Sequence, residues 1–123
     1  MTTQNTSRKA AASLLRDELR RALEHARQAD YDEPSSMALS RANHLLDSVA
    51  AAALDAAALR IGIGVDGAIA IHASNGVRSV SLEIDPVNGS LELVVSDERA
   101  RRVISALENP TEAEVVQELE RAA

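Results

Sequence analysis

All five glycines lie between Gly62 and Gly89, whereas the segments before and after this stretch contain none. Glycine is common in turns and costs stability inside a helix. Between the glycines, branched apolar residues alternate with small or polar ones, which is typical of strands with one buried face. The distribution therefore predicts helices, then a β-sheet, then helices again, in a single α+β domain that spans residues 1–123.

The segment before the glycines predicts a helical hairpin. Leucine and alanine recur at helical spacing over residues 7–29 and again over residues 35–56, so each helix has an apolar stripe that can pack on a core. Pro34 and Ser35 mark the start of the second helix. The link between the helices is short, which favours an antiparallel arrangement. Residues 1–6 are expected to be disordered.

The middle segment predicts four antiparallel strands in a meander over residues 59–96. A three-residue loop ending at Gly67 places Ile63 opposite Ile69, and a shorter loop would turn these side chains to opposite faces. Two-residue turns at Asn75-Gly76 and Asn88-Gly89 place Ile71 opposite Val80 and Ile84 opposite Leu93.

In this register one face of the sheet carries every large apolar side chain, and helices are expected to cover it. The predicted inner face consists of Leu59, Ile61, Ile63, Ile69, Ile71, Val80, Leu82, Ile84, Leu91, Leu93 and Val95. The other face is small on the first hairpin, with Gly62, Gly64, Ala68 and Ala70, and acidic on the second. Small residues inside strands suggest close packing of a neighbour, although an open hairpin is an equal alternative.

The segment after the glycines predicts two short helices. Ser96, followed by two acidic residues, is suited to cap the first, whose apolar positions run from Ala100 to Leu107. Thr111 and Glu114 form a capping box that starts the second. A lone helix of this length is marginal in water, so residues 110–123 are expected either to dock on this chain or to detach and bind a partner through Val116 and Leu119.

Composition excludes several classes of function. There is no cysteine, which removes disulfides, thiolate nucleophiles and zinc–thiolate sites. No apolar run approaches the roughly 20 residues that cross a bilayer, and no signal-peptide pattern opens the chain, so the expected location is cytoplasmic, without a membrane partner. Phosphate-binding loops, nucleophile elbows and dinucleotide fingerprints are also absent. We therefore expect no enzymatic activity, no catalytic or metal site and no cofactor.

Charge is unevenly distributed along the chain. Residues 1–29 carry six basic and three acidic side chains, a net charge of +3, so the remainder carries −9 of the total of −6. One side of the first helix presents Lys9, Arg16, Arg20 and Arg27. This stripe could follow a phosphate backbone, but the acidic remainder would repel a polyanion. The alternative is a row of charges paired within the chain, with Arg20 and Arg27 both near Glu24.

The acidic side of the sheet is the candidate surface for a protein partner. Its residues are Glu83, Asp85 and Glu92, and in the predicted register Asp85 lies directly opposite Glu92. Like charges across a strand pair are mildly destabilising, which favours a compensating cation from a basic partner. A solvated edge, or a longer loop that changes the pairing, is the alternative.

Three hypotheses about function follow. The preferred one is a non-enzymatic protein-binding module of bacterial type, such as an antitoxin, immunity protein, inhibitor or dedicated chaperone, and a homodimer. The second is a nucleic-acid-associated regulator that uses the basic stripe. The third is a small enzyme or ligand-binding domain at a dimer cleft, with His72 as its base. The other histidines, His25 and His44, are expected on the surface without a ligand role.

Overall fold

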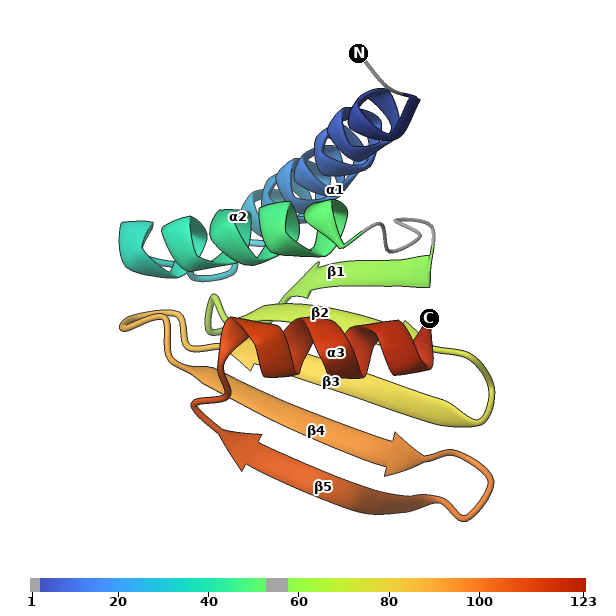
Figure 1. The fold of residues 1–123 in the computed structure, drawn as a ribbon. Helices are drawn as coiled ribbons and strands as arrows, with labels where there is room; N and C mark the ends of the chain where they lie inside the picture. The colour runs from blue at the N-terminus through green and yellow to red at the C-terminus, as the bar shows by residue number, and fades with distance from the viewer. Residues whose placement is uncertain (1–2, 53–57) are drawn as a thin grey trace.

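The computed structural model describes residues 3–52 and 58–123, which form an α+β domain around one antiparallel sheet (Figure 1). Two helices lead, α1 (Thr3–Gln28) and α2 (Ser36–Ala51), and one closes the chain, α3 (Glu112–Ala122). Five strands lie between them in sheet order: β1 (Leu59–Ile63), β2 (Ile69–Ser74), β3 (Arg78–Ile84), β4 (Leu91–Asp97) and β5 (Arg102–Glu108). The predicted class is confirmed, but the sheet has five strands instead of four.

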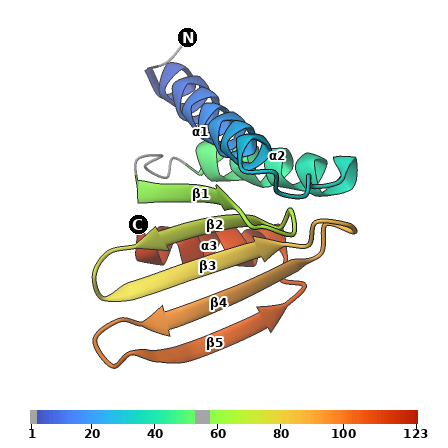
Figure 2. The same cartoon turned by 180° about the vertical axis from the view of Figure 1, so that it is seen from behind.

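The strands present their large apolar side chains to one face, as the sequence predicts. Ile69, Ile71, Leu82 and Leu93 are all buried in the same core cluster. Figures 1 and 2 show α3 on this side of the sheet, and α3 packs over β2 and β3. α1 contacts both α2 and β1, and the two leading helices cross at an angle above the β1 edge. We call this side the covered face and the other the open face.

Only the first hairpin has the predicted register. Ile63 pairs with Ile69 and Ile61 with Ile71 across β1 and β2. Gly67 adopts a φ of 87°, a left-handed conformation that glycine reaches without strain. Asp32 and Glu33 also pack against it, since an added Cβ would lie 3.0 Å from the Asp32 carbonyl oxygen.

The second and third hairpins are each shifted by two residues from the predicted register. Ile71 lies opposite Leu82 instead of Val80, and Ile84 lies opposite Leu91 instead of Leu93. In the second hairpin, Gly76 occupies the first turn position with a φ of 86°. In the third, the turn is longer: the Asp85 carboxylate accepts from the Val87 and Asn88 amides within it, and the N–H of Ser35, the N-cap of α2, donates to the Pro86 carbonyl at 2.8 Å.

An even shift leaves every side chain on its predicted face, because side chains alternate with a period of two residues. The sidedness prediction therefore survives two register errors. A shift of one residue would have turned the leucines and isoleucines of β3 and β4 into solvent.

The prediction of a helix from Ser96 to Leu107 is wrong, because this segment forms a turn and then β5. The Asp97 carboxylate accepts hydrogen bonds from the Arg99 and Ala100 amides at 3.0 and 3.1 Å, which closes a turn instead of starting a helix. β5 then pairs with β4, with an irregularity at Val95/Ser96. Pairing of β5 satisfies the backbone groups along the outer edge of β4, which a helix in this segment would leave to water.

The last helix has the predicted capping box and docks on its own chain. The Thr111 hydroxyl accepts from the Glu114 N–H at 3.1 Å, and the Glu114 carboxylate accepts from the Thr111 N–H at 3.0 Å. Val115, Leu119 and Ala122 are fully buried against the sheet. The helix is therefore part of the core in this structure.

The helical boundaries differ slightly from those predicted. α1 begins at Thr3, inside the segment expected to be disordered, and residues 1–2 lie outside the described part. α2 ends at Ala51, and the predicted continuation to residue 56 falls mostly outside the described residues. None of the described helices combines the length and apolar character needed to cross a bilayer.

Candidate functional site

The described helices leave the open face of the sheet uncovered (Figure 2). Cross-strand pairing arranges its residues in rows that run across the strands. One row contains Gly62, Ala70, Glu83, Glu92 and Glu108, and the next contains Arg60, His72, Ser81, Val94 and Ala106. Half of these side chains are short, namely those of Gly62, Ala70, Ser81, Val94 and Ala106, so another molecule could approach the sheet closely at these positions.

Three glutamates occupy adjacent places in the first row. Glu83 pairs with Glu92, and Glu92 pairs with Glu108, on neighbouring strands about 4.8 Å apart. All three side chains are exposed. We call these residues the acidic row. Like charges directly opposite one another are destabilising, so the row lowers the stability of the isolated sheet.

The acidic row has no internal counter-charge in the part of the chain that the structure describes. Every ion pair found there involves other carboxylates. The same residues contain no group of three or more ligating side chains suited to a metal ion. The arrangement can attract cationic groups from outside.

Asp85 does not belong to this row, and the predicted pairing of Asp85 with Glu92 is wrong. Asp85 lies in the β3–β4 turn, where its carboxylate accepts from the Val87 and Asn88 amides at 2.9 and 3.0 Å. These backbone hydrogen bonds, that from Asn88 foremost, lower the pKa of Asp85 below its ordinary value. Asp85 therefore stabilises the β3–β4 turn.

Glu108 is the residue that the sequence analysis missed. Its segment reads as a helix in isolation, and only the pairing of β5 with β4 places it beside Glu92. No local signal in the sequence identifies it as a member of the acidic row.

The two apolar candidates on the last helix are not free surface. Leu119 has no exposed area and Val116 is half-buried against the core. A partner could contact Leu119 only if α3 left the sheet. The Glu118 carboxylate accepts from the Arg78 guanidinium of β3 at 2.9 Å, which adds a polar contact to this docking.

Three of the four cations in the α1 stripe have partners within the chain. Arg16 pairs with Asp47 at 2.6 Å and Arg27 with Glu33 at 2.5 Å. Arg20 lies 3.2 Å from Glu24 and 3.8 Å from Asp17. Lys9 is exposed, and no ion pair joins it to a described carboxylate. The stripe is thus largely a charge row paired with its own molecule.

The histidines lie in three separate places. His72 is on the open face, with its Nδ1 at 2.8 Å from the Ser81 hydroxyl. His44 on α2 contacts the Glu112 carboxylate, which also accepts from the Ser48 hydroxyl at 3.2 Å. His25 lines a pocket beside β1. The structure does not bring these three side chains together.

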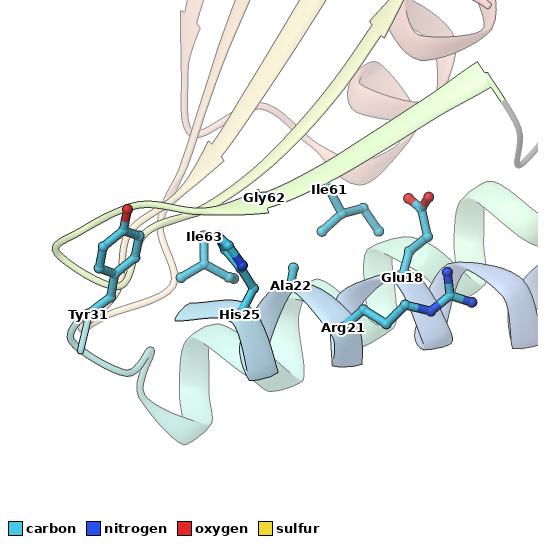
Figure 3. A pocket seen from close by; sticks show the side chains of 8 residues that line it. All are labelled: Glu18, Arg21, Ala22, His25, Tyr31, Ile61, Gly62 and Ile63. Atoms are coloured by element: carbon cyan, nitrogen blue, oxygen red, sulfur yellow. The ribbon is translucent and has the colours of Figure 1, made fainter. Parts of the chain in front are cut away.

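Two of the pockets formed by the described residues lie between elements distant in sequence. One has a volume of about 420 Å³ and lies between α1 and β1, where Ile61 and Ile63 point towards Ala22 and His25 (Figure 3). The other, about 800 Å³, lies between α2, the β3–β4 turn and the start of α3. Its lining residues are Ser36, Met37, Ser40, Arg41, His44, Asn88, Gly89 and Glu112. Both pockets are lined by elements that are distant in sequence, so local sequence patterns could not predict them.

Comparison with family models, with curated proteins and with solved structures finds no match to this chain.

Proposed function

We propose that this chain is a protein-binding module that receives a basic segment of a partner protein on the open face of its sheet. The observation that carries this proposal is the acidic row, which crosses three strands on a surface that no described helix covers. The sheet keeps these like charges adjacent although their repulsion lowers its stability. Cationic side chains from a partner would remove that repulsion on binding.

The spacing of the acidic row favours a helix that lies across the strands. Neighbouring strands are about 4.8 Å apart, and residues three or four apart on a helix are separated by about 5–6 Å. Three basic residues on one side of a partner helix can therefore each meet one glutamate. The short side chains of Ala70, Ser81 and Ala106 leave room for that helix to approach the sheet.

Binding of nucleic acid through α1 has weaker support. Intramolecular ion pairs engage Arg16, Arg20 and Arg27, so contact with phosphates would have to break them. The acidic row on the same domain would also repel a polyanion.

The test uses a fluorescent helical peptide with lysines at positions i, i+4 and i+7, titrated with the protein and followed by anisotropy. The wild type should bind the peptide, and affinity should fall as salt is added. The triple variant Glu83→Gln, Glu92→Gln, Glu108→Gln should bind at least about tenfold more weakly, because three exposed ion pairs of about 0.5–1 kcal/mol each are lost.

A control variant has the same net charge as the triple variant, but its three substitutions lie outside the acidic row. Glu18→Gln, Asp32→Asn and Glu120→Gln remove three carboxylates that form no ion pair with described residues. This control should retain wild-type affinity within about twofold. Equal weakening in both triple variants would reduce the effect to net charge and overturn the proposal.

A photo-crosslinking residue at Ser81, in the centre of the open face, locates the partner in the native cell. The proposal expects one dominant adduct at Ser81 that disappears in the Glu83, Glu92, Glu108 triple variant. The same probe at Gln117, an exposed residue of α3, serves as the reference position. Adducts only with a second copy of this chain, or equally at both positions, would contradict the proposal.

A further inference from the structure

The edge strand β5 exposes apolar side chains to solvent. Val103 is 60% exposed and Ile104 is 53% exposed, and among the described strands only β5 has large apolar side chains that are exposed. The described helices pack mainly over β1, β2 and β3, and both views show β5 at the opposite edge of the sheet (Figures 1 and 2). The fold described here therefore leaves this apolar surface uncovered.

Strand pairing places Val103 on the open face beside two other apolar residues. Val103 pairs with Ser96 of β4, and Ser96 lies two residues after Val94, which pairs with Ala106. Residues two apart on a strand share a face, and cross-strand partners share it too. Val94 is half-buried and Ala106 is exposed. We call Val94, Val103 and Ala106 the apolar strip.

The apolar strip borders the acidic row. Val94 is two residues from Glu92 on β4, and Ala106 is two residues from Glu108 on β5. Side chains two residues apart on one face start about 7 Å from each other. One ligand of modest width can therefore contact the strip and the row together.

The combination of the two features is more informative than either one. A single exposed valine is ordinary, because much of the surface of any folded protein is apolar. An apolar surface bordered by charged groups is typical of a binding site for another protein. The acidic row defines the charge of the matching surface, and the apolar strip defines its apolar side.

We propose that the partner segment is an amphipathic helix whose basic residues lie over the acidic row and whose apolar residues pack on the apolar strip. This inference rests on the proposed function, because the acidic row supplies the attraction. The strip adds selectivity. Exposed ion pairs are weak and form with many basic segments, whereas burial of Val103 requires an apolar side chain in the matching place.

A helix has the dimensions to cover both features. Its diameter with side chains is about 10–12 Å, which exceeds the separation of about 7 Å between row and strip. At about 100° per residue, lysines at i, i+4 and i+7 share one side of a helix, and residues at i−1, i+3 and i+10 lie on the adjoining side. A helix can lie along the row in either direction, so one of the two directions brings this adjoining side over the strip.

The test compares two fluorescent helical peptides of identical composition, both with lysines at i, i+4 and i+7. The flank peptide has leucines at i−1, i+3 and i+10, beside the lysines. The back peptide has them at i−2, i+2 and i+9, on the opposite side. Anisotropy titrations should show about fivefold tighter binding of the flank peptide, because only its leucines reach the strip.

The outcome separates this inference from the proposed function. Equal affinities of the two peptides would overturn the inference and leave the acidic row as a binding site for basic segments. If neither peptide bound in low salt, both proposals would fall. The advantage of the flank peptide should persist as salt is added, since salt screens charges and not apolar contacts.

Val103→Thr tests the strip directly, because threonine has a similar shape and the same preference for strands but buries a hydroxyl in place of a methyl group. This variant should bind the flank peptide about threefold to fivefold more weakly and the back peptide within about twofold of the wild type. Val65→Thr is the matched control. Val65 is 70% exposed but lies between β1 and β2, so this control should change neither affinity.

Unchanged binding of the flank peptide by Val103→Thr would overturn the role of the strip, as would equal weakening by Val65→Thr. The triple variant of the acidic row should weaken both peptides, whereas Val103→Thr should weaken only the flank peptide. If the triple variant bound both peptides as tightly as the wild type, the acidic row would have no part in binding and both proposals would fall.

Discussion

The covered and open faces of the sheet come from alternate residues of the same strands, yet their side chains have opposite relations to the rest of the chain. Leu82 on the covered face is fully buried, while its neighbours Ser81 and Glu83 on the open face are exposed. The charge of Arg78 on the covered side is paired with Glu118 of α3. The charges of the acidic row have no such partner among the described residues.

This difference indicates which face stabilises the fold and which face is available for binding. Burial of apolar area is the main favourable contribution to folding, and it occurs on the covered face. The open face adds little apolar burial and includes three adjacent like charges. Substitutions on the two faces should therefore have different magnitudes and even opposite signs.

The largest difference is expected at neighbouring positions of β3. Leu82→Ala removes a fully buried side chain and should lower the free energy of unfolding by about 2–5 kcal/mol. Ser81→Ala, on the open face, should change it by about 0.5 kcal/mol or less. Urea denaturation measures both. Similar losses at the two positions would mean that the faces are not distinct in stability.

The second-largest change in stability is expected at the ion pair between Arg78 and Glu118 on the covered face. In the Glu118→Gln variant, the Arg78 guanidinium loses its carboxylate partner. The Arg78 side chain is 30% exposed, and its Nε already lacks a hydrogen-bond partner. We expect a loss of about 1–2 kcal/mol in thermal or chemical unfolding. Arg121→Gln removes the more exposed partner of Glu118 and should cost about 0.5 kcal/mol or less. A reversed order would show that the Arg78 contact does not stabilise α3.

A smaller effect of opposite sign is expected in the acidic row. Glu92 lies between two other glutamates, so Glu92→Gln removes both repulsions and should raise the free energy of unfolding by about 0.5 kcal/mol. The gain should shrink as salt is added, since these charges are exposed. A loss of stability in low salt would indicate that the row has an internal counter-charge.

The smallest effect concerns Asp85 and acid. Because backbone hydrogen bonds lower its pKa in the folded state, Asp85 contributes stability above its unfolded pKa, and this contribution is lost as pH falls through the folded value. Asp85→Asn keeps the oxygen that accepts from Val87 and Asn88. The variant should fold normally and lose stability less steeply below about pH 4. Parallel acid titrations of the two proteins would contradict this role.

The sequence predicted the sidedness of the sheet better than its register. Alternation of branched and small residues is a local property, and burial of one face enforces it. The turn positions depend on more than the Asn-Gly pairs. Gly76 is the first turn residue of its hairpin, and the longer loop after β3 is hydrogen-bonded to Ser35, the N-cap of α2.

The fifth strand illustrates the limit of local patterns most clearly. Ala100, Val103, Ile104 and Leu107 have a spacing that fits a helix, and Asp97 can begin either a turn or a helix. β4 offers a row of unpaired backbone groups, which a strand satisfies and a helix does not. The acidic row depends on this choice, so Glu108 could not be identified before the pairing was known.

By itself, the sequence determined the α+β class, the capping box at Thr111 and the side of the sheet on which each large side chain of the first four strands lies, because spacing along the chain governs each of these. Tertiary structure decided the strand pairing beyond the first hairpin, the conversion of residues 102–108 into an edge strand, and the ion pairs that engage the arginines of α1. These features need groups far apart in sequence to meet, and their free energy depends on that meeting.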